Sequence, residues 1–479
     1  MPVRGDILEL AIDSSGFEGT SVARHEGMVV FVDGAVAGDV VRAQIVRTKK
    51  KHLEAKVVEV LRPSPNRTTP RCKYFGTCGG CRWQHVEYES QLAFKQQHVV
   101  DALERIGGFK GVPILPIIPS KEIYFYRNKL EFSFGDKRWL TKEEMDLTPG
   151  PVPSGEEKIK GAGELVLGFH IPQRYDKILD IDECHLQSEL SNGILNAVKS
   201  FAVEHSLKAY TSQPQSGYLR NLVIREGKNT GDVMVNLVTY DDRPEVMKEL
   251  TAALTKSFPE IVTVVNNITS KLANVAVGET EKVYHGNGVF TEKIGDHLFH
   301  LSANSFFQTN TRQAEVLYRV AKEFAELTPN DVVYDLYCGT GAISLYVSGS
   351  VKQVVGIELI ESSIINAKMN AEVNGIRNCE FIAGDLKDLL TKDIGWKKRY
   401  AAPDVLIIDP PRSGMHPKAV EEIGGMKIPR IVYVSCNPTT LARDLQLLSP
   451  FGYSIEKVQP VDMFPHTYHI ESVTRLRLR

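Results

Sequence analysis

The sequence has little that would place it in or across a membrane. No apolar run in its 479 residues approaches the roughly 20 residues that a membrane-spanning helix needs. The first ten residues, MPVRGDILEL, lack the long apolar core of a secretory signal. We therefore expect a cytoplasmic protein with no membrane partner. Only seven cysteines are present, and so few in an intracellular chain favour metal binding or catalysis over disulfides.

An excess of charge of either sign is also lacking, because 57 lysines and arginines nearly balance 59 aspartates and glutamates and the formal net charge is only −2. The distribution is uneven, however: residues 42–73 contain ten lysines and arginines against two glutamates. A local basic cluster of this kind is typical of a phosphate-binding surface, although a merely solvated basic face would have the same composition. Hydrophobic residues make up 42%, which is ordinary for a globular chain, and the length predicts two to four domains.

The N-terminal part, residues 1–62, predicts a small β-barrel. Its glycines punctuate short apolar runs without a helical period, as expected for several strands joined by turns. Together with the basic cluster, this pattern favours an oligonucleotide-binding barrel. The predicted strands are Ile7–Ile12, Met28–Val32, Val40–Val46 and Ala55–Val60, and Arg62–Pro70 is predicted to be a linker.

Three cysteines within ten residues, Cys72, Cys78 and Cys81, have the spacing of metal ligands. The glycines between the last two allow the backbone to fold tightly around a bound centre. A fourth ligand is needed, and Cys184 is the only other cysteine in the first half of the chain. Four thiolates suit zinc or a [4Fe–4S] cluster, and the spacing alone does not decide between them. In the zinc case His85 or His185 is an alternative ligand.

Residues 63–300 predict a central domain of mixed α and β structure. We expect a helix from Tyr88 to Ile106, and an exposed insertion at 136–163. Arg127 and Lys129 lie beside aromatic and apolar positions, so they are candidate contacts for RNA phosphates and bases, with ordinary surface polarity as the alternative. The predicted strands are Lys129–Phe134, Glu164–Phe169, Leu219–Arg225, Val233–Val238 and Val262–Asn267.

Residues 301–479 alternate strand and helix, which predicts a parallel sheet. A strand ending in Asp335 runs into a glycine-rich turn that contains Gly339, and Glu358 ends the next strand 23 residues later. Close glycines let a cofactor approach the backbone, and the second acidic residue is suited to a ribose diol. The departure from G-x-G-x-x-G favours S-adenosylmethionine over a dinucleotide. Asp385 is expected to reach the adenine, with a generic nucleotide site or plain sheet packing as the alternatives.

The fourth and fifth strands of this sheet end in Asp409-Pro-Pro-Arg412 and in Cys436. Ligands and chemistry in open α/β sheets lie at the carboxyl ends of strands, so we interpret Cys436 as a nucleophile, although a lone cysteine there is usually a small core residue. A helix is expected over Thr439–Leu448, and its N-terminus favours a thiol of low pKa. The end of the chain, Ile455–Val461 and Ser472–Arg479, is predicted to complete the sheet as a hairpin.

Several motifs in this order resemble one family, the RNA 5-methyluridine (uracil-C5) methyltransferases, in particular the iron–sulfur branch that acts on 23S ribosomal RNA. The resemblance covers nearly the whole chain. It rests on the N-terminal barrel, which is a TRAM domain in that family, and on the C-x5-C-x2-C cysteines with Cys184. It continues through SFFQTN at 305–310, DLYCGTGAISL at 335–345, IIDPPR at 407–412, VSCNP at 434–438 and FPHTYHIES at 464–472.

The resemblance implies a C-terminal class I, Rossmann-like methyltransferase domain and a [4Fe–4S] cluster on the four cysteines. It implies Cys436 as the nucleophile and Glu471 as the base. Around S-adenosylmethionine it places Gln308, Tyr337, Glu358 and Asp409. RNA is the implied partner, ribosomal RNA before transfer RNA, and no obligate protein partner is implied.

This assignment agrees with the chemistry that uracil requires. C5 of uracil is a poor nucleophile until a thiolate adds at C6, and a base must then remove the C5 proton so that the thiol can leave. A uracil within a stacked RNA would have to be flipped out, and Phe306 is a candidate platform for it. Two other interpretations are an amino-group methyltransferase that uses the DPPR motif without a nucleophile, and an RNA-binding scaffold without activity.

Overall fold

The protein is represented by a computed structural model that describes residues 2–141, 159–160, 164–172, 174–212, 215–272, 278–391 and 399–479. The chain forms two compact units. The first contains Met1–Gly76, Gly80–Ile123 and Ile407–Arg479, and the second contains Thr77–Gly79 and Tyr124–Leu406. Most of the insertion expected at 136–163 lies outside the described residues. Within the described ranges, no helix combines the length and apolar character needed to cross a bilayer.

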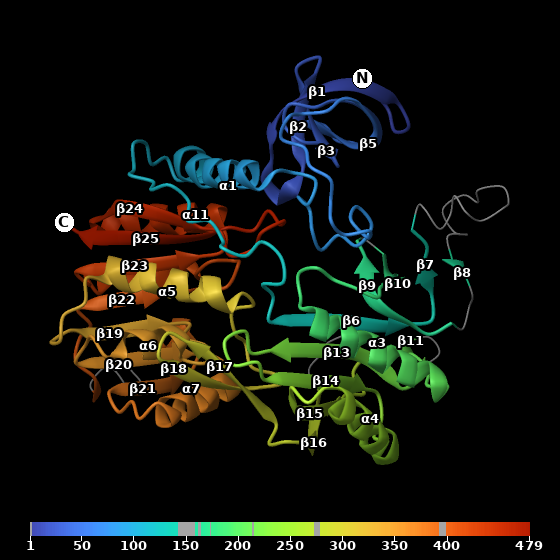
Figure 1. Ribbon diagram of the computed structural model, residues 1–479. Helices are drawn as coiled ribbons and strands as arrows, with labels where there is room; N and C mark the ends of the chain where they lie inside the picture. The colour runs from blue at the N-terminus through green and yellow to red at the C-terminus, as the bar shows by residue number, and fades with distance from the viewer. Residues whose placement is uncertain are drawn as a thin grey trace. The chain divides into compact units, whose positions relative to one another are not determined.

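The N-terminal strands close into a five-stranded barrel with the order β1-β2-β3-β5-β4, drawn in blue in Figure 1. Alternate residues of each strand point inward, and the resulting core includes Leu10, Val30, Ile45 and Leu53. The barrel is confirmed, with one strand more than predicted. Its strands are β1 Ile7–Ser15, β2 Ser21–His25, β3 Met28–Asp33, β4 Val40–Thr48 and β5 His52–Arg62.

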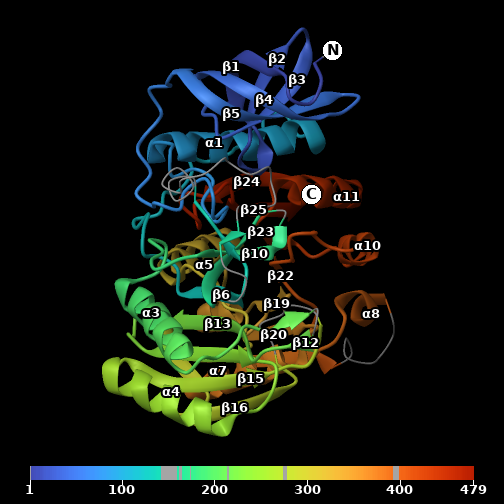
Figure 2. The ribbon, with the colours of Figure 1, turned by 90° about the vertical axis from the view of Figure 1, so that its right-hand side faces the viewer.

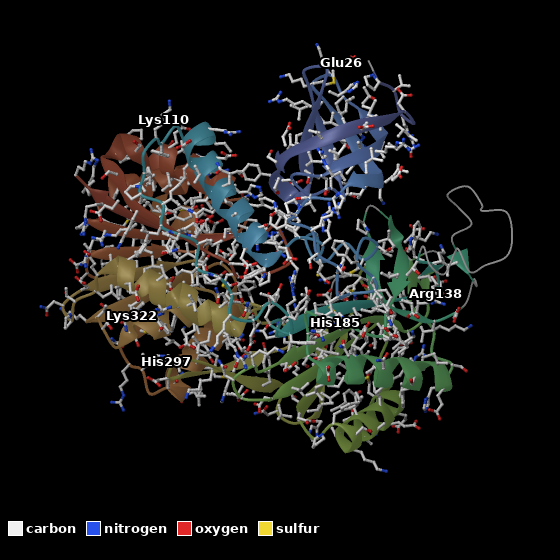
Figure 3. All side chains as sticks on the ribbon, turned by 45° about the horizontal axis from the view of Figure 1, so that its top comes forward. Glu26, Lys110, Arg138, His185, His297 and Lys322 are labelled. Atoms are coloured by element: carbon white, nitrogen blue, oxygen red, sulfur yellow. The ribbon has the colours of Figure 1, made fainter. Side chains whose placement is uncertain are left out.

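The strand that the sequence analysis missed, β2, is short and follows a turn rich in glycine. A two-residue turn joins it to β3, and both turn residues, Glu26 and Gly27, have positive φ (49° and 82°). This is the backbone that a tight hairpin between twisted strands requires. Glu26 therefore projects at the tip of the barrel, where Figure 3 labels it.

The helix predicted over Tyr88–Ile106 changes character before its end. Helix α1 covers Tyr88–Asp101, and one π-helical turn, Ala102–Ile106, follows it. The inner face of α1 is unusually polar, because Gln91, Lys95 and His98 are all buried. A periodic apolar stripe is therefore absent from this helix, and its packing depends on specific hydrogen bonds.

The second unit contains a nine-stranded sheet with the order β16-β15-β14-β13-β6-β9-β10-β7-β8. Helices α3 (Glu189–Glu204) and α4 (Pro244–Ser257) pack on each other and on its strands (Figure 1, Figure 2). The strands are β6 Lys129–Gly135, β7 Arg138–Trp139, β8 Ile159–Lys160, β9 Val166–Ile171, β10 Arg174–Asp180, β13 Leu219–Glu226, β14 Val233–Thr239, β15 Ile261–Ile268 and β16 Thr280–His285. Five of these were predicted, namely β6, β9, β13, β14 and β15. Two small hairpins accompany the sheet: β11 Thr211–Ser212 with β12 Gln215–Ser216, and β17 Val289–Ile294 with β18 His297–Ser302.

The last third forms a seven-stranded sheet with the order β21-β20-β19-β22-β23-β25-β24, and the boundary between the two units falls within β22. Strands β19, β20 and β21 are parallel, whereas β25 is antiparallel to both β23 and β24, which confirms the expected parallel sheet with a terminal hairpin. The strands are β19 Val332–Leu336, β20 Gln353–Glu358, β21 Cys379–Ala383, β22 Val405–Ile408, β23 Arg430–Ser435, β24 Tyr453–Val461 and β25 Glu471–Leu478. The helices between them are α6 Ala342–Ser348, α7 Glu361–Val373, α8 Leu386–Thr391, α10 Pro417–Gly425 and α11 Pro438–Leu448, after α5 Thr311–Ala325.

Candidate active site

Cys436 lies in the tight turn between the buried strand β23 and helix α11. The hydroxyl of Ser435 donates to the carbonyl of Asn437 (3.1 Å) and accepts from its amide (3.2 Å). The side chain of Asn437 in turn accepts from the amide of Thr439 (3.0 Å) and caps the helix. With Pro438 fixing the first helical residue, the backbone on both sides of Cys436 is held in one conformation.

Glu471 reaches the same place from the neighbouring strand. Strands β23 and β25 are antiparallel with Ser435 opposite Ser472. One step further along each strand, Cys436 and Glu471 therefore follow at the same end of the pair. Glu471 is buried, and the register of two strands thus brings together residues that are 35 positions apart.

The DPPR loop is bonded to the helix that follows Cys436. The carbonyl of Arg412 accepts from the side chain of Asn437 (3.1 Å) and from the hydroxyl of Thr440 (3.2 Å). Arg412 also extends its guanidinium toward Nε2 of His469 (3.4 Å). Residues of the loop after β22 and of the loop before β25 therefore lie beside Cys436.

The buried carboxylate of Asp444 on α11 links these segments through hydrogen bonds. It accepts from the amide of Met415 (2.8 Å) and from the hydroxyl of Tyr433 (2.6 Å), and Arg443 donates to it from the adjacent position (2.8 Å). Asp444 therefore connects the strand that ends at Cys436, the loop that carries Arg412 and helix α11. Sequence reasoning gave no role to Asp444, since nothing in its neighbourhood identifies its distant partners.

The protonation of the two central groups differs from the expectation of a low-pKa thiol. Burial, then the carboxylates of Glu471 and Asp409, raise the pKa of Cys436 to about 12, against a lowering effect of Arg412. Burial and Asp409 raise the pKa of Glu471 well above its usual range, again opposed by Arg412. The expectation was wrong for this state because the helix N-terminus is outweighed by burial and by two nearby carboxylates. The thiol of Cys436 is therefore uncharged near neutral pH in this state.

A cavity of about 210 Å³ opens onto Cys436. All its lining residues belong to the first unit, and two of them, Phe17 and Glu18, come from the N-terminal barrel. The others are His98, Arg412, Cys436, Asn437, Pro438, Thr439, Tyr468, His469 and Ile470. The barrel residues and His98 were not among the predicted site residues. The only available signal was the position of Tyr468 and His469 within the FPHTYHIES motif.

The loop 462–470, which leads into Glu471, rests on the polar face of α1. The buried Lys95 forms an ion pair with Asp462 (2.6 Å) and donates to the carbonyl of Phe464 (3.0 Å), and the hydroxyl of Tyr88 donates to Asp462 (2.7 Å). Burial lowers the pKa of Lys95, and Asp462 opposes this effect. These bonds fix the start of the loop.

The middle of this loop is fixed through His466, which has a positive φ of 64°. The carbonyl of His466 accepts from the amides of Arg82 (2.9 Å) and Trp83 (3.0 Å), and its own amide donates to Gln91 (2.8 Å). The segment that begins at Cys81 is therefore hydrogen-bonded to the loop that delivers Glu471.

The second unit contains the glycine-rich turn. Asp335 on β19 is fully buried, and Ser344 donates to one of its carboxylate oxygens (2.6 Å). Burial, opposed by Ser344 and reinforced by Glu358, raises the pKa of Asp335 to about 7. Gly339 and Gly341 both have positive φ (54° and 81°), which side chains with a Cβ rarely adopt. These glycines make the turn as sharp as the sequence predicted.

Glu358 at the end of β20 reaches this turn. Its carboxylate accepts from the amides of Gly339 (3.1 Å) and Ile360 (3.0 Å). The hydroxyl of Thr340, between the two glycines, donates to the carbonyl of Phe306 (3.5 Å). The structure thus brings Glu358, Gly339 and Phe306 together, although they come from three separate motifs.

The remaining predicted ligands lie around the same elements. Tyr337 has a positive φ of 64° just before the turn, and Asp385 follows Gly384, whose amide donates to the carbonyl of Glu358 (2.9 Å). The carbonyl of Gln308 accepts from Asn128 (2.8 Å). Asp409, by contrast, belongs to the first unit, where its charge raises the pKa of both Cys436 and Glu471.

The predicted RNA contacts differ in character. Phe306 is 65% exposed, which is unusual for a phenylalanine and suits a stacking surface. Lys129 is partly buried, and burial and Arg225 lower its pKa, while Glu131 lies 4.0 Å away. Arg127 is partly buried, and its amide donates to Leu186 (2.8 Å).

The four predicted metal ligands are all partly buried. Cys72 and Cys81 belong to the first unit and Cys78 and Cys184 to the second. Among the residues that the structure describes, no three histidine, cysteine or acidic side chains form a group able to hold a metal ion. Four cysteine thiolates are the donor set that a [4Fe–4S] cluster needs.

The basic segment 42–73 is partly neutralised within the barrel. Arg42 pairs with Glu59 (3.1 Å) and Arg67 with the buried Asp39 (2.7 Å). The lysines at 49–51, on the turn between β4 and β5, are exposed. Lys56, Arg62, Arg71 and Lys73 are exposed as well, so the basic surface of this segment extends beyond that turn.

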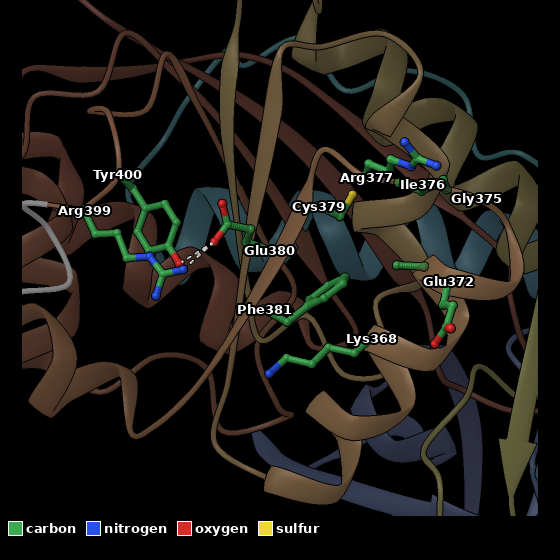
Figure 4. A pocket seen from close by; sticks show the side chains of 11 residues that line it. Lys368, Glu372, Gly375, Ile376, Arg377, Cys379, Glu380, Phe381, Arg399 and Tyr400 are labelled. Atoms are coloured by element: carbon green, nitrogen blue, oxygen red, sulfur yellow. Dashed lines mark hydrogen bonds and ion pairs between the residues drawn. The ribbon is translucent and has the colours of Figure 1, made fainter.

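A larger cavity of about 620 Å³ lies beside the edge strand β21 (Figure 4). Glu380 accepts there from the hydroxyl of Tyr400 (2.9 Å) and pairs with Arg399 (3.3 Å). Lys368 and Glu372 of α7 add one charge of each sign. The lining contains neither the glycine-rich turn nor Cys436, so this cavity is not the candidate site.

Comparison with known proteins agrees with this architecture. A family model described as tRNA (uracil-5-)-methyltransferase matches residues 248–478, and a TRAM domain model matches residues 3–58. A Chlorobaculum tepidum protein named as an uncharacterized RNA methyltransferase is 44% identical over 473 residues, which is 98% of this chain and 96% of the relative. A Bacteroides thetaiotaomicron protein of the same description is 44% identical over 465 residues, 96% of this chain and 99% of the relative.

Among solved structures, the tRNA (uracil-54, C5)-methyltransferase of Pyrococcus abyssi in complex with S-adenosyl-L-homocysteine matches with a TM-score of 0.73. It is 28% identical, and the match covers 98% of this chain and 100% of that one. The Rossmann-like fold and the N-terminal TRAM barrel are thereby confirmed. The chain belongs to the tRNA (uracil-5-)-methyltransferase family, and it is an RNA methyltransferase with a TRAM domain.

Proposed function

We propose that this protein transfers a methyl group from S-adenosylmethionine to C5 of a uridine in 23S ribosomal RNA. The observation that carries the proposal is the pairing of Cys436 and Glu471 at the same end of adjacent strands, beside a cavity of about 210 Å³. An amino-group methyltransferase would need neither a thiol nor a buried carboxyl in that place.

The mechanism follows from the positions of these two groups. The thiol of Cys436 gives its proton to solvent water, and the sulfur forms a bond to C6 of uracil, so that the electron pair of the C5–C6 double bond becomes available at C5. C5 then takes the methyl group that S-adenosylmethionine supplies. Glu471 removes the C5 proton, and the electrons of that bond re-form C5–C6 as the sulfur leaves.

The environment of Glu471 suits a base that acts late. A buried carboxyl of raised pKa is a stronger base once ionised than an exposed carboxylate. Arg412, which opposes the pKa rise at both Cys436 and Glu471, favours the ionised forms that the reaction requires. Asp409 raises both pKa values, so a cation near Asp409 would assist thiolate formation.

For the methyl donor we propose Asp335, Tyr337, Gly339, Glu358, Asp385, Gln308 and Asp409 as the binding set. The support is the hydrogen bond between Glu358 and the amide of Gly339, which shows an acidic group at the backbone of the sharp turn. A ribose diol could replace that bond with its own hydroxyl groups. The Pyrococcus abyssi relative was solved with S-adenosyl-L-homocysteine bound.

We propose three domains in this chain: residues 1–62, 63–300 and 301–479. We also propose that Cys72, Cys78, Cys81 and Cys184 hold a [4Fe–4S] cluster, and that Phe306, Arg127 and Lys129 contact RNA. The cluster is supported by the spacing of Cys72, Cys78 and Cys81 together with Cys184. It is a structural element in this proposal, and no step of the reaction passes through it.

The cluster has a direct test. Anaerobically purified protein should contain about four irons per chain and absorb broadly in the visible region. Replacing any one of the four cysteines by serine should remove this absorbance, whereas Cys379→Ser should retain it. Zinc without iron in the purified protein would overturn the cluster and leave a zinc site.

A transfer RNA substrate is the second candidate. It is favoured by the description of the family model and by the Pyrococcus abyssi relative. The deciding experiment is mass spectrometry of nuclease-digested RNA after reaction, with unmodified 23S ribosomal RNA and a transfer RNA transcript offered side by side. 5-Methyluridine in ribosomal RNA supports the proposal. 5-Methyluridine in transfer RNA alone would support the same mechanism but overturn ribosomal RNA as the substrate. A methylated adenine or guanine would overturn the mechanism.

A further inference from the structure

The cavity that contains Cys436 is closed on one side by the N-terminal barrel. The turn between β1 and β2, residues Phe17–Gly19, supplies Phe17 and Glu18 to its lining. A barrel that served only to attract RNA would have no reason to contribute side chains to this cavity.

The ring of Phe17 is held as a platform. It stacks on the ring of His98 with a centroid distance of 4.8 Å and an angle of 26°. His98 is itself fixed, because its Nε2 lies 3.4 Å from the carbonyl of Ser15 and Trp83 packs at 6.0 Å on its ring. Phe17 nevertheless remains 40% exposed. One part of its surface is thus occupied by His98, while another lines the cavity.

The turn itself has an uncommon backbone that fixes this placement. Glu18 has a φ of 62°, and Gly19 follows with a φ of 79°. A Cβ on Gly19 would lie 3.2 Å from Cδ1 of Tyr468 and 3.0 Å from Cβ of Arg82. The turn is therefore packed closely against the loop that leads to Glu471, and a strained non-glycine residue such as Glu18 is often found at a functional site.

The chemistry of this wall selects a base and disfavours a phosphate. Glu18 carries a carboxylate that repels phosphate, and burial lowers the pKa of His98, so its ring is uncharged near neutral pH. An aromatic face beside a neutral ring suits a nucleobase, which stacks through its π-face. The volume of about 210 Å³ is below the roughly 300–1,000 Å³ of ordinary ligand pockets, which suits one planar base at a time on this wall.

We propose that Phe17 is a positioning residue on which a base next to the target uridine stacks, so that the TRAM barrel orients the RNA at Cys436. This inference rests on the proposed function, because the stacked base belongs to the RNA that is methylated. It adds to that function a role for the barrel in the geometry of the reaction.

The first arm of the test uses the wild-type protein. The shortest RNA fragment in which it forms 5-methyluridine is mapped, and its Kd is measured. If no RNA is methylated at uridine, the proposed function itself fails. If methylation is found, Phe17→Ala is expected to weaken binding of that fragment by about 5- to 150-fold, as removal of one base–aromatic stack does.

Matched variants separate stacking from general damage. Phe31 on the same barrel also packs on a histidine, His52, at 5.2 Å, but it does not line the cavity. Phe31→Ala should therefore bind RNA like the wild type, and Phe17→Trp should retain binding. Phe17→Leu keeps an apolar side chain for folding and should lose affinity as Phe17→Ala does. Equal losses in the Phe17→Ala and Phe31→Ala variants would overturn the proposal.

A double-mutant cycle identifies the partner base. Fragments with an abasic residue at each position within two nucleotides of the mapped uridine are bound to wild type and Phe17→Ala. At one position, the loss caused by Phe17→Ala should shrink to less than about twofold, because the stack is already absent. A loss that persists at every abasic position would show that Phe17 does not stack on a neighbouring base.

Discussion

The hydroxyl of Tyr433 donates a hydrogen bond of 2.6 Å to the buried carboxylate of Asp444, and this bond joins the strand before Cys436 to the helix after it. Asp444 also holds the amide of Met415 beyond the DPPR loop. The position of the reactive sulfur is thereby set by residues that never contact substrate.

Tyr433→Phe should lower both stability and turnover. Loss of a buried hydrogen bond to a carboxylate costs about 1–3 kcal/mol in the free energy of unfolding. We also expect kcat to fall by about tenfold, since a misplacement of 1 Å at a reacting group can cost about a hundredfold. Urea unfolding and single-turnover methylation measure the two effects.

The control is Tyr453→Phe, which removes the bond of another buried tyrosine to the carbonyl of Ile428 (3.0 Å) at the opposite end of the sheet strands. It should cost about 0.5–1.5 kcal/mol of stability and leave kcat within twofold. If both variants lose the same activity, Asp444 has no special part in placing Cys436.

Cys436→Ala should abolish methylation, and Glu471→Gln should trap the RNA on the protein. Without its base, the adduct between Cys436 and C6 cannot lose the C5 proton, so the thiol cannot leave. Denaturing gel electrophoresis of labelled RNA with Glu471→Gln should show a covalent complex. The double variant Cys436→Ala/Glu471→Gln should show none.

Cys379→Ala serves as the control, because Cys379 is also a free thiol whose pKa burial raises to about 12. It should methylate RNA like the wild type. Undiminished turnover in Cys436→Ala would exclude the nucleophile assignment.

Activity should rise with pH. The thiol of Cys436 must be deprotonated to react, and its pKa is raised to about 12 in the free protein, so the reactive fraction increases as pH increases. We expect kcat/KM to grow by up to about tenfold per pH unit between pH 6.5 and 9, where one deprotonation limits the rate. Adduct formation by Glu471→Gln should keep the same slope. A profile that is flat or falls over this range would contradict the raised pKa.

Glu471→Gln should also stabilise the fold at high pH. The pKa of Glu471 is raised in the folded state, so its contribution to stability is present below the unfolded pKa and is lost as pH rises through the folded pKa. Glutamine stays uncharged and avoids this loss. The Tm of the variant should exceed that of wild type by a margin that widens from pH 6 to pH 9, by about 2–4 °C for each kcal/mol.

The exposed Glu421 supplies the control for this measurement. Glu421→Gln should leave Tm within about 1 °C at both pH values, because exposed charge substitutions rarely exceed ±0.5 kcal/mol. A margin between Glu471→Gln and wild type that narrowed with pH would reverse the predicted sign.

Lys95→Met should destabilise the protein strongly, because it leaves Asp462 buried without its counter-charge. Breaking a buried ion pair in this way costs about 3–5 kcal/mol. The exposed pair Lys248–Glu245, at 3.0 Å, provides the comparison, and Lys248→Met should cost no more than about 1 kcal/mol. If Lys95→Met unfolds at the same urea concentration as wild type, the loop 462–470 does not depend on this pair.

The strands that lead to Asp335, Glu358, Asp409 and Cys436 could be predicted from the sequence, because each is an apolar run that ends near a polar residue or cysteine. The polar buried face of α1 could not be predicted from the sequence. Gln91 and Lys95 are buried there because they bond to His466 and Asp462, which lie more than 360 positions later in the chain.

The same limit explains the error at Cys436. The local sequence shows a helix N-terminus, which lowers a thiol pKa. The carboxylates of Asp409 and Glu471 that raise it come from other strands, and only the strand register brings them near. The wall formed by Phe17 was missed for a related reason: a phenylalanine in a glycine-rich turn of a barrel carries no local mark of a distant cavity.

The dependence of α1 on the loop 462–470 bears on how the chain is made. Domains usually fold in the order of their synthesis, and the barrel has its own core among residues 10–55. Helix α1 cannot complete its packing in that order. The buried Lys95 cannot form its ion pair until Asp462, 367 residues later, has been synthesised. Helix α1 therefore lacks these partners until residues 462–466 have been made, and the site around Cys436 cannot form before Glu471.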